Sequence, residues 1–231
     1  MRKDRFRSLV NLFRSISSID ELLLILLALR YRGKFNCPEG IFGCIAPLGG
    51  DLGFHEAGLL YWIARNWPVE GPVIELGSFA GKSTIVLAST GRKVHAVDAW
   101  SLEVDDPSAY HKKSIKSGEI IFRDFFQNLA KSNVATSVTV HRGLTNDVVL
   151  TWKEQAALLF IDAGHTYTNL RDDLANWTPF LHQNGILLIH DVVGSSHPGV
   201  KRAASELLRQ GWSIRNRAGS IVAFTRRNVE D

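Results

Sequence analysis

VIELGSFAGKST, residues 73–84, has the pattern of a buried strand, a tight turn and the start of a helix. The apolar, β-branched run ends in an acid, two glycines frame the turn, and Ile85 to Ala88 can continue as a helix. A helix that starts there points its unpaired N–H groups at the space above the turn, and the glycines let a ligand approach the backbone. We therefore expect a nucleotide-like ligand at this turn.

The spacing of this turn departs from both familiar nucleotide motifs. A P-loop needs four residues between its first glycine and the Gly-Lys-Ser/Thr, whereas three separate Gly77 from Gly81. The dinucleotide fingerprint lacks its third glycine. A second short strand, residues 93–98, ends in Asp98, at the distance of about 20 residues from which a carboxylate can bind ribose hydroxyls. The pattern favours a nucleoside, and a P-loop-like phosphotransferase using Lys82 and Ser83 stays open as the alternative.

Composition limits the classes of protein to consider. With 231 residues, 45% of them hydrophobic and 22% charged, the chain can bury one sizeable core, which favours one domain with added helices. The net charge of +4 is spread over the two ends of the chain without an aromatic-interleaved basic run, so we expect no nucleic-acid partner. Cys37 and Cys44 match no zinc or redox spacing, which is typical of reduced thiols in a cytoplasmic protein.

We expect residues 1–52 to form an N-terminal element of helices and loop. Apolar residues at helical spacing predict a helix over 6–16, and Ser18 with Glu21 marks the start of a second, over 20–31. The apolar run at 22–29 is shorter than the roughly 20 residues that span a bilayer. The element would pack on the sheet or in a homo-oligomer interface. The alternative is a basic amphipathic segment in peripheral contact with an anionic membrane or a lipid-like substrate.

Two segments lack a regular pattern. Residues 37–53 are rich in glycine and proline, which predicts an irregular loop and a candidate wall of the substrate pocket. Residues 99–118 are long for a connection without secondary structure, and they would form either a lid or a plain insertion.

The rest of the chain alternates strands with helices. Parallel-type strands are expected at 137–141, 158–162 and 185–191, and helices at 55–66, 119–129, 167–177 and 200–208. Strands at 212–215 and 220–225, joined through 216–219, form a closing antiparallel hairpin. This order predicts an α/β fold with an open, mostly parallel sheet, helices on both faces, and ligands beyond the carboxyl ends of the strands.

Polar residues gather at those carboxyl ends. Each has an ordinary structural explanation, such as capping the next helix, but together they follow four strands on one edge of the sheet. They are Glu75, Asp98, Asp162, His165, His190 and Asp191.

Two motifs carry a family resemblance. IDAGHTY at 161–167 fits Ile-Asp-x-x-His-x-Tyr, and the strand from Gly185 ends in His190-Asp191. From about residue 52 to 227 the chain resembles a class I S-adenosylmethionine-dependent methyltransferase, most of all the O-methyltransferases that act on sugars and other hydroxyls of natural products. The resemblance implies a methyltransferase domain over 53–231, with a Rossmann-like fold and a mostly parallel seven-stranded sheet. It also implies a small hydroxylated molecule as substrate.

The resemblance assigns roles residue by residue. The adenosyl cofactor would contact the turn after the first strand, the acid that ends the second strand, the segment after the third strand and the acid that ends the fourth strand. Asp98 would bind the ribose, and Gly143 and Leu144 would lie near the adenine. These cofactor-binding positions are Glu75, Gly77, Ser78, Gly81, Ser83, Asp98, Gly143, Leu144 and Asp162.

Metal-dependent relatives hold the substrate oxygens on a divalent ion. Mapped onto this chain, the ligands are Asp162, His190 and Asp191, and His165 is the catalytic base beside Asp162. The ion would make the acceptor hydroxyl more acidic, so that a histidine of near-neutral pKa could deprotonate it. Because a histidine suits a transition metal better than magnesium, a metal-free version stays open, in which Asp191 or His190 orients the hydroxyl. A pseudo-enzyme that only binds the cofactor is a further alternative.

Overall fold

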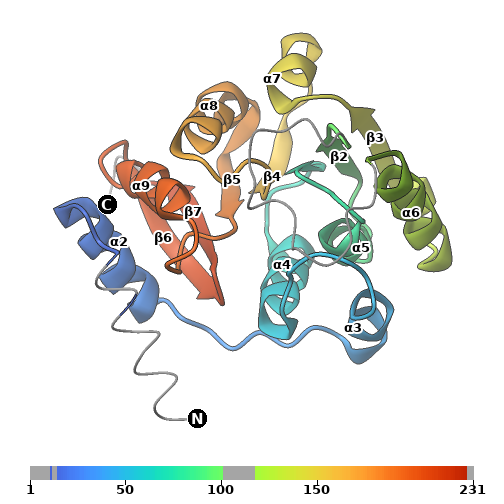
Figure 1. Cartoon of the computed structure of the whole chain (residues 1–231), viewed down its shortest axis with the longest axis horizontal. Coiled ribbons are helices and arrows are strands. Elements are labelled where there is room, and N and C mark those ends of the chain that lie inside the picture. Colours follow the sequence, from blue (N-terminus) through green and yellow to red (C-terminus); the bar gives the residue numbers. More distant parts are fainter. Residues whose placement is uncertain (1–10, 12–14, 101–117, 228–231) are drawn as a thin grey trace.

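The computed structural model describes residue 11, residues 15–100 and residues 118–227. A seven-stranded sheet lies between two layers of helices (Figure 1). The strands are β1 (Val73–Leu76), β2 (Val94–Asp98), β3 (Val138–Arg142), β4 (Ala156–Ile161), β5 (Leu181–Ile189), β6 (Trp212–Ala218) and β7 (Ile221–Arg226).

The strand order confirms the fold that the sequence predicts. The order is β3-β2-β1-β4-β5-β7-β6, with β1 to β5 parallel and β7 antiparallel to both β5 and β6. The chain changes direction across the sheet between β1 and β4. In open parallel sheets, ligands bind beyond the carboxyl ends of the strands at such a reversal.

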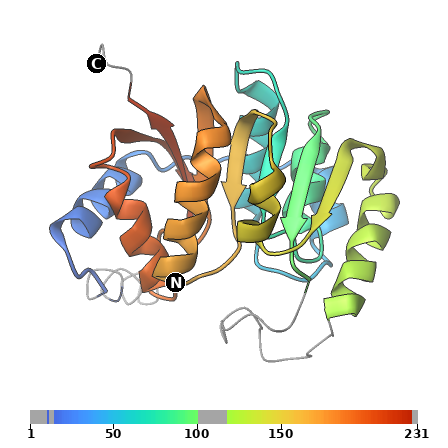
Figure 2. The same cartoon turned by 90° about the horizontal axis from the view of Figure 1, so that it is seen from above.

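Helices cover both faces of the sheet (Figure 2). One face carries α3, α4, α5 and α6, and the other carries α2, α8 and α9. The helices are α2 (Ile19–Arg30), α3 (Glu39–Ile45), α4 (Phe54–Asn66), α5 (Lys82–Ala88), α6 (Gly118–Lys131), α7 (Thr145–Val148), α8 (Tyr167–Trp177) and α9 (Pro198–Glu206), with short 3-10 turns at Ala135–Ser137, Val149–Thr151 and Thr178–Phe180. All four residues of β1 are buried, as expected of a central strand covered on both sides.

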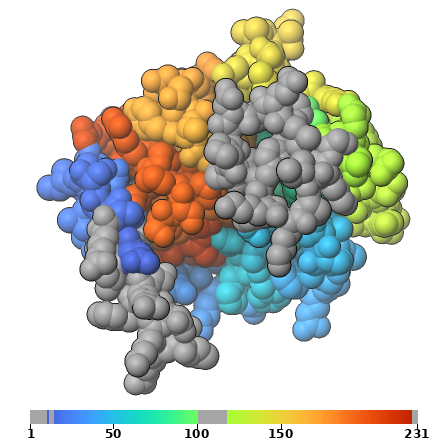
Figure 3. Space-filling model, viewed as in Figure 1, coloured from blue at the N-terminus to red at the C-terminus, as the bar shows by residue number. Residues whose placement is uncertain are grey.

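Within the N-terminal element, helix α2 lies against α9 (Figure 3, blue beside orange-red). The hydroxyl of Ser18 accepts a hydrogen bond from the Glu21 amide, as the capping signature predicts. The ammonium of Lys201 in α9 is fully buried, donates to the carbonyl and hydroxyl of Ser15, and lies 4.0 Å from Glu21. No helix in the described part of the chain is both long and apolar enough to span a membrane. The division of the chain at residue 52 stays a prediction.

The expectation of an irregular loop over 37–53 is wrong for residues 39–45, which are helical, and is confirmed for residues 46–53. Helix α3 begins directly after Pro38. Its Phe42 ring packs edge-on against Phe54, with ring centroids 4.9 Å apart, and Ile45 is buried in the core. This packing overrides the low helix propensity of Gly40 and Gly43.

The closing hairpin has a tighter turn than predicted. Asn216, Arg217 and Ala218 belong to β6 instead of the connection. The amide of Arg217 donates to the carbonyl of Tyr31, and its carbonyl accepts from the amide of Gly33. This pairing with a segment distant in sequence extends the strand. The expected helix over 6–16 and the lid or insertion over 99–118 lie largely outside the described residues.

Candidate active site

A cavity of about 1190 Å³ opens at the carboxyl ends of the parallel strands. It joins the turn after β1, the end of β2, the segment after β3 and the loops after β4 and β5. Ligand pockets usually measure about 300–1,000 Å³, so this one has room for two molecules side by side. Its lining includes Gly77, Asp98, Gly143, Leu144, Asp162, His165, His190, Asp191 and His197.

Gly77 brings the first turn against the loop after β4. Its φ of +87° lies in the left-handed region, and a Cβ there would overlap the carbonyl of Asp162. Gly81 has the same φ, but it packs on Phe125 of α6 and does not line the cavity. Gly77 therefore shapes the floor of the cavity, while Gly81 sets the start of α5.

Asp98 holds the turn in place. One carboxylate oxygen accepts from the amides of Ser78 and Phe79, at 2.9 and 2.8 Å, and the other accepts from the amide of Trp100 at 2.7 Å. Burial raises the pKa of Asp98, although the three amides oppose the shift. The carboxylate thus fixes the turn and also faces the cavity.

Glu75 lies beneath the turn and is fully buried. Its Oε2 accepts hydrogen bonds from the hydroxyls of Ser78 and Thr84, at 2.8 and 2.5 Å. Oε1 has no hydrogen-bond partner among the described residues. Burial raises the pKa of Glu75 to about 7, against the effect of its hydroxyl partners, which include Ser83. Four predicted cofactor-binding residues are not part of the cavity wall: Glu75, Ser78, Gly81 and Ser83. They support the turn from the side that faces away from the cavity.

The three predicted metal ligands lie together at the other end of the cavity. Nδ1 of His190 is 3.3 Å from Oδ1 of Asp162 and 3.3 Å from Oδ1 of Asp191. The ligand atoms of the three residues all lie within 4.8 Å of one another. Asp191 has a φ of +58°, a conformation that aspartate tolerates better than most residues.

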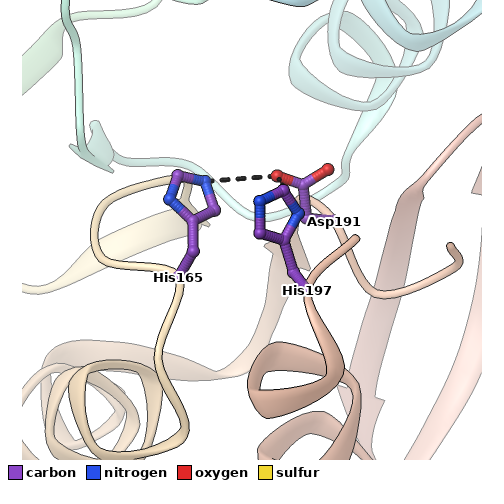
Figure 4. A group of neighbouring side chains, drawn as sticks. All are labelled: His165, Asp191 and His197. Atoms are coloured by element: carbon purple, nitrogen blue, oxygen red, sulfur yellow. Dashed lines mark ion pairs between the residues drawn. The ribbon is translucent and has the colours of Figure 1, made fainter. Parts of the chain in front are cut away.

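Two further histidines face the other oxygen of Asp191 (Figure 4). Nε2 of His165 lies 3.2 Å from Oδ2, and Nδ1 of His197 lies 3.3 Å from the same atom. The two imidazole rings are 4.5 Å apart and tilted by 32°. The sequence interpretation missed His197. The available signal was its place on the connection from the fifth strand, directly before the proline that opens α9.

Residues far away in the sequence orient His190. Its Nε2 is 3.4 Å from the hydroxyl of Ser220 and 3.8 Å from Glu56. Because the amide and hydroxyl of Ser220 both donate to Glu56, the Ser220 oxygen is left to accept from Nε2. When His190 is neutral, its Nδ1 then faces the cluster with its lone pair. Sequence reasoning missed this support as well.

The two carboxylates favour positive charge in the cluster. Burial would lower the pKa of His165, but Asp162 and Asp191 raise it to about 10. The neighbouring carboxylates likewise raise the pKa of His190 against the effect of burial. Burial would raise the pKa of Asp191, but the neighbouring histidines lower it. Burial would likewise raise the pKa of Glu56, but His190 and two backbone amides lower it to about 2. Protons or a metal ion can supply the charge.

The cluster fits a divalent ion. Nδ1 of His190 is buried and has no hydrogen-bond partner among the described residues, although two carboxylate oxygens lie 3.3 Å away. Its other nitrogen faces Ser220 and Glu56, which is the usual outer support of a metal-binding histidine. The first turn likewise fits an adenosyl ligand, because Gly77 and the carboxylate of Asp98 line the same cavity wall as Gly143 and Leu144.

A family model described as a methyltransferase domain matches residues 74–192, more than half of the chain. The chain belongs to this methyltransferase family. The class I resemblance predicted from the sequence is thereby confirmed.

Solved methyltransferase structures share the fold. The O-methyltransferase TomG from Streptomyces achromogenes, solved in complex with S-adenosylmethionine, is 14% identical with a TM-score of 0.60, covering 84% of this chain and 92% of its own. An O-methyltransferase from Bacillus cereus in complex with S-adenosylhomocysteine is 19% identical with a TM-score of 0.59, covering 81% and 90%. An S-adenosylhomocysteine-bound methyltransferase from Podospora anserina is 12% identical with a TM-score of 0.61, covering 92% and 98%.

Family membership decides between the two interpretations of the first turn. In this methyltransferase the ammonium of Lys82 donates to the carbonyl of Gly50 at 2.8 Å and is not part of the cavity wall. It is therefore not placed as a P-loop lysine that reaches toward phosphates.

Proposed function

We propose that this methyltransferase uses S-adenosylmethionine to methylate a hydroxyl of a small molecule such as a sugar or another natural product. The observation that carries the proposal is one cavity with the glycine turn and Asp98 at one end and the histidine–carboxylate cluster at the other. Transfer requires a methyl donor and an acceptor oxygen in line within reach of a proton acceptor. The cavity has the size and the groups for both molecules.

The cofactor end of the cavity is assigned to the turn and its neighbours. S-adenosylmethionine, when bound, supplies an electrophilic methyl group on a sulfonium. Gly77 gives the ligand access to the backbone, Asp98 holds the turn and faces the ribose, and Gly143 and Leu144 line the wall for the adenine. Glu75, Ser78, Gly81 and Ser83 would act mainly by supporting the turn.

The acceptor end is assigned to the loops after β4 and β5. Asp162, His190 and Asp191 would hold a divalent ion, which when bound makes a nearby hydroxyl more acidic. Asn169 and Ser196 also line this end, and both can hydrogen-bond a polyhydroxylated acceptor. In the metal-free alternative, Asp191 or His190 orients the hydroxyl directly.

His165 is the proposed proton acceptor. It lies at the cavity wall, 3.2 Å from Asp191 and 3.7 Å from Asp162. These carboxylates stabilise the imidazolium that forms when His165 takes the acceptor proton. Because they raise the pKa of His165 to about 10, and not to the near-neutral value expected from the sequence, turnover should rise with pH through the alkaline range.

The decisive test is binding of S-adenosylhomocysteine, measured by isothermal titration calorimetry on the full chain. We expect a single site with a dissociation constant in the micromolar range or below. Absence of heat at millimolar ligand, from protein with an intact circular dichroism spectrum, would remove the proposal. Transfer of a labelled methyl group to a panel of sugars and phenols then tests the acceptor class.

A pseudo-enzyme that only binds the cofactor makes a different prediction for His165. In the proposed mechanism, His165→Ala lowers turnover by a factor on the order of 100 or more and leaves S-adenosylhomocysteine affinity within a few-fold. A scaffold would keep its cellular function in the same variant.

Residues 1–52 are proposed as a cap or oligomer element, and sedimentation of the full chain tests whether it assembles. Cytoplasmic location and membrane contact remain sequence predictions.

A further inference from the structure

His165, Asp191 and His197 come from three separate positions around the rim of the cavity. His165 follows β4, Asp191 follows β5, and His197 directly precedes α9 (Figure 4). The three side chains are 19–20% exposed, so an ion in the cavity can reach them. Each presents one donor atom toward a common point.

The distances among these donor atoms suit a small dication. Nε2 of His165 and Nδ1 of His197 lie 3.2 and 3.3 Å from Oδ2 of Asp191, and all three atoms are within 4.8 Å of one another. Ligands about 2.0–2.1 Å from a tetrahedral zinc ion lie about 3.3 Å apart. Two histidines and one carboxylate, with a fourth position open, are a common zinc donor set.

These atoms differ from those assigned to the first metal position. His190 faces Oδ1 of Asp191, whereas His165 and His197 face Oδ2. We propose that His165, Asp191 and His197 form a second cation site, which binds a transition-metal dication of the zinc class. Asp191 is the residue shared by the two sites.

The donor set also sets the selectivity of the second site. Mg²⁺ and Ca²⁺ prefer oxygen ligands, whereas imidazole suits zinc and its transition-metal neighbours. Two of the three protein donors are imidazole nitrogens. The site should therefore bind Zn²⁺ or Co²⁺ and discriminate strongly against Mg²⁺.

Occupation of this site has a consequence that rests on the proposed function. A dication on Nε2 of His165 takes the lone pair with which that residue would accept the acceptor proton. Zn²⁺ should therefore inhibit methyl transfer, and the inhibition should depend on His197.

The binding test uses Co²⁺, whose visible absorption reports tetrahedral coordination, together with equilibrium dialysis against Zn²⁺. Asp162→Asn removes a ligand of the first position and isolates the second, so this variant should still bind one Co²⁺. Adding His197→Gln should weaken that binding by at least about 100-fold. His182→Gln, at the opposite end of β5, removes a histidine outside the cluster and should leave Co²⁺ affinity unchanged.

Two results would overturn the second site. The first is that Asp162→Asn binds no Co²⁺ even at millimolar metal. Asp191 would then only accept hydrogen bonds from His165 and His197, and no second cation site would exist. The other is equal affinity with and without His197. If a variant does not fold, imidazole nitrogen resonances of the unaltered protein decide, because an unperturbed His197 signal at saturating Co²⁺ excludes it as a ligand. Intact S-adenosylhomocysteine binding separates failure here from failure of the proposed function.

Discussion

Gly77 lies directly against the backbone of Asp162, so that a Cβ at position 77 would overlap the Asp162 carbonyl. The turn after β1 and the loop after β4 are thereby locked together at the floor of the cavity. One end of the proposed cofactor site and one side of the carboxylate cluster share this contact.

Replacing Gly77 with alanine should therefore be more damaging than its φ alone implies. Gly91 is a matched control, because its φ of +90° is close to the +87° of Gly77 but its Cβ would meet nothing within 4 Å. Gly91→Ala should lower the free energy of unfolding by about 1 kcal/mol, and Gly77→Ala by at least about 3 kcal/mol. Urea unfolding measures both, and equal losses would show that the contact with Asp162 is unimportant.

Glu75 should make stability depend on pH. Its folded pKa of about 7 lies above the ordinary value of 4.5, so between these values the folded chain keeps a proton that the unfolded chain has lost. Stability contributed by the protonated carboxyl is thus fully present below 4.5 and is lost as pH rises through 7. Relative to Glu75→Gln, the cofactor-free protein should lose on the order of 3 kcal/mol over this range. Parallel pH profiles of the two proteins, from urea unfolding, would contradict this.

Asp98 should be essential for the geometry of the turn. Both carboxylate oxygens of Asp98 accept hydrogen bonds from backbone amides. In Asp98→Asn one of these oxygens becomes an NH₂ group, which cannot accept, so at least one backbone N–H loses its acceptor in either orientation of the side-chain amide. S-adenosylhomocysteine affinity should fall by about 10- to 100-fold, the value of one or two charged hydrogen bonds. Asp147→Asn, at an exposed position in α7, provides the control for calorimetry. Unchanged affinity in Asp98→Asn would show that the turn does not depend on this carboxylate.

Lys201 should hold α2 against α9. Lys201→Met removes a buried cation and leaves Glu21 and Ser15 without it, at an expected loss on the order of 3 kcal/mol. Lys153→Met, at an exposed position, should change stability little. Hydrogen exchange adds a local readout, since amides of α2 should exchange faster in Lys201→Met while those of β4 do not. If the amides of α2 exchange at the same rate in Lys201→Met as in Lys153→Met, Lys201 does not hold α2 in place.

The mostly parallel sheet was predictable because its central strands have recognisable sequence patterns. The strand over 156–161 is apolar throughout, and 73–74 and 186–189 are apolar runs within their strands, as is typical of strands covered on both faces. Helix α3 was not predictable, since its glycines suppress the local signal and its packing on Phe54 is tertiary. The length of β6 depends likewise on pairing with residues 31–33.

Within the candidate site, the sequence brings out residues next to strands and misses those that approach from elsewhere. Asp162, His190 and Asp191 follow buried strands, so their meeting at one sheet edge could be expected. Their distances and the role of each oxygen of Asp191 could not. His197 and Glu56 belong to the starts of other helices, and the patterns of α9 and α4 give no reason to turn either side chain toward the cluster.

The hydroxyl of Ser220 accepts from the Asp191 amide at 3.4 Å and donates to Glu56, which faces His190. Both Ser220 and Glu56 lie outside the segment 74–192 that the family shares. A protein trimmed to that segment would keep Asp162, His190 and Asp191 yet lose Ser220 and Glu56, which orient His190. Swapping this catalytic segment into another member of the family should therefore succeed only when helix α4 and the terminal hairpin travel with it.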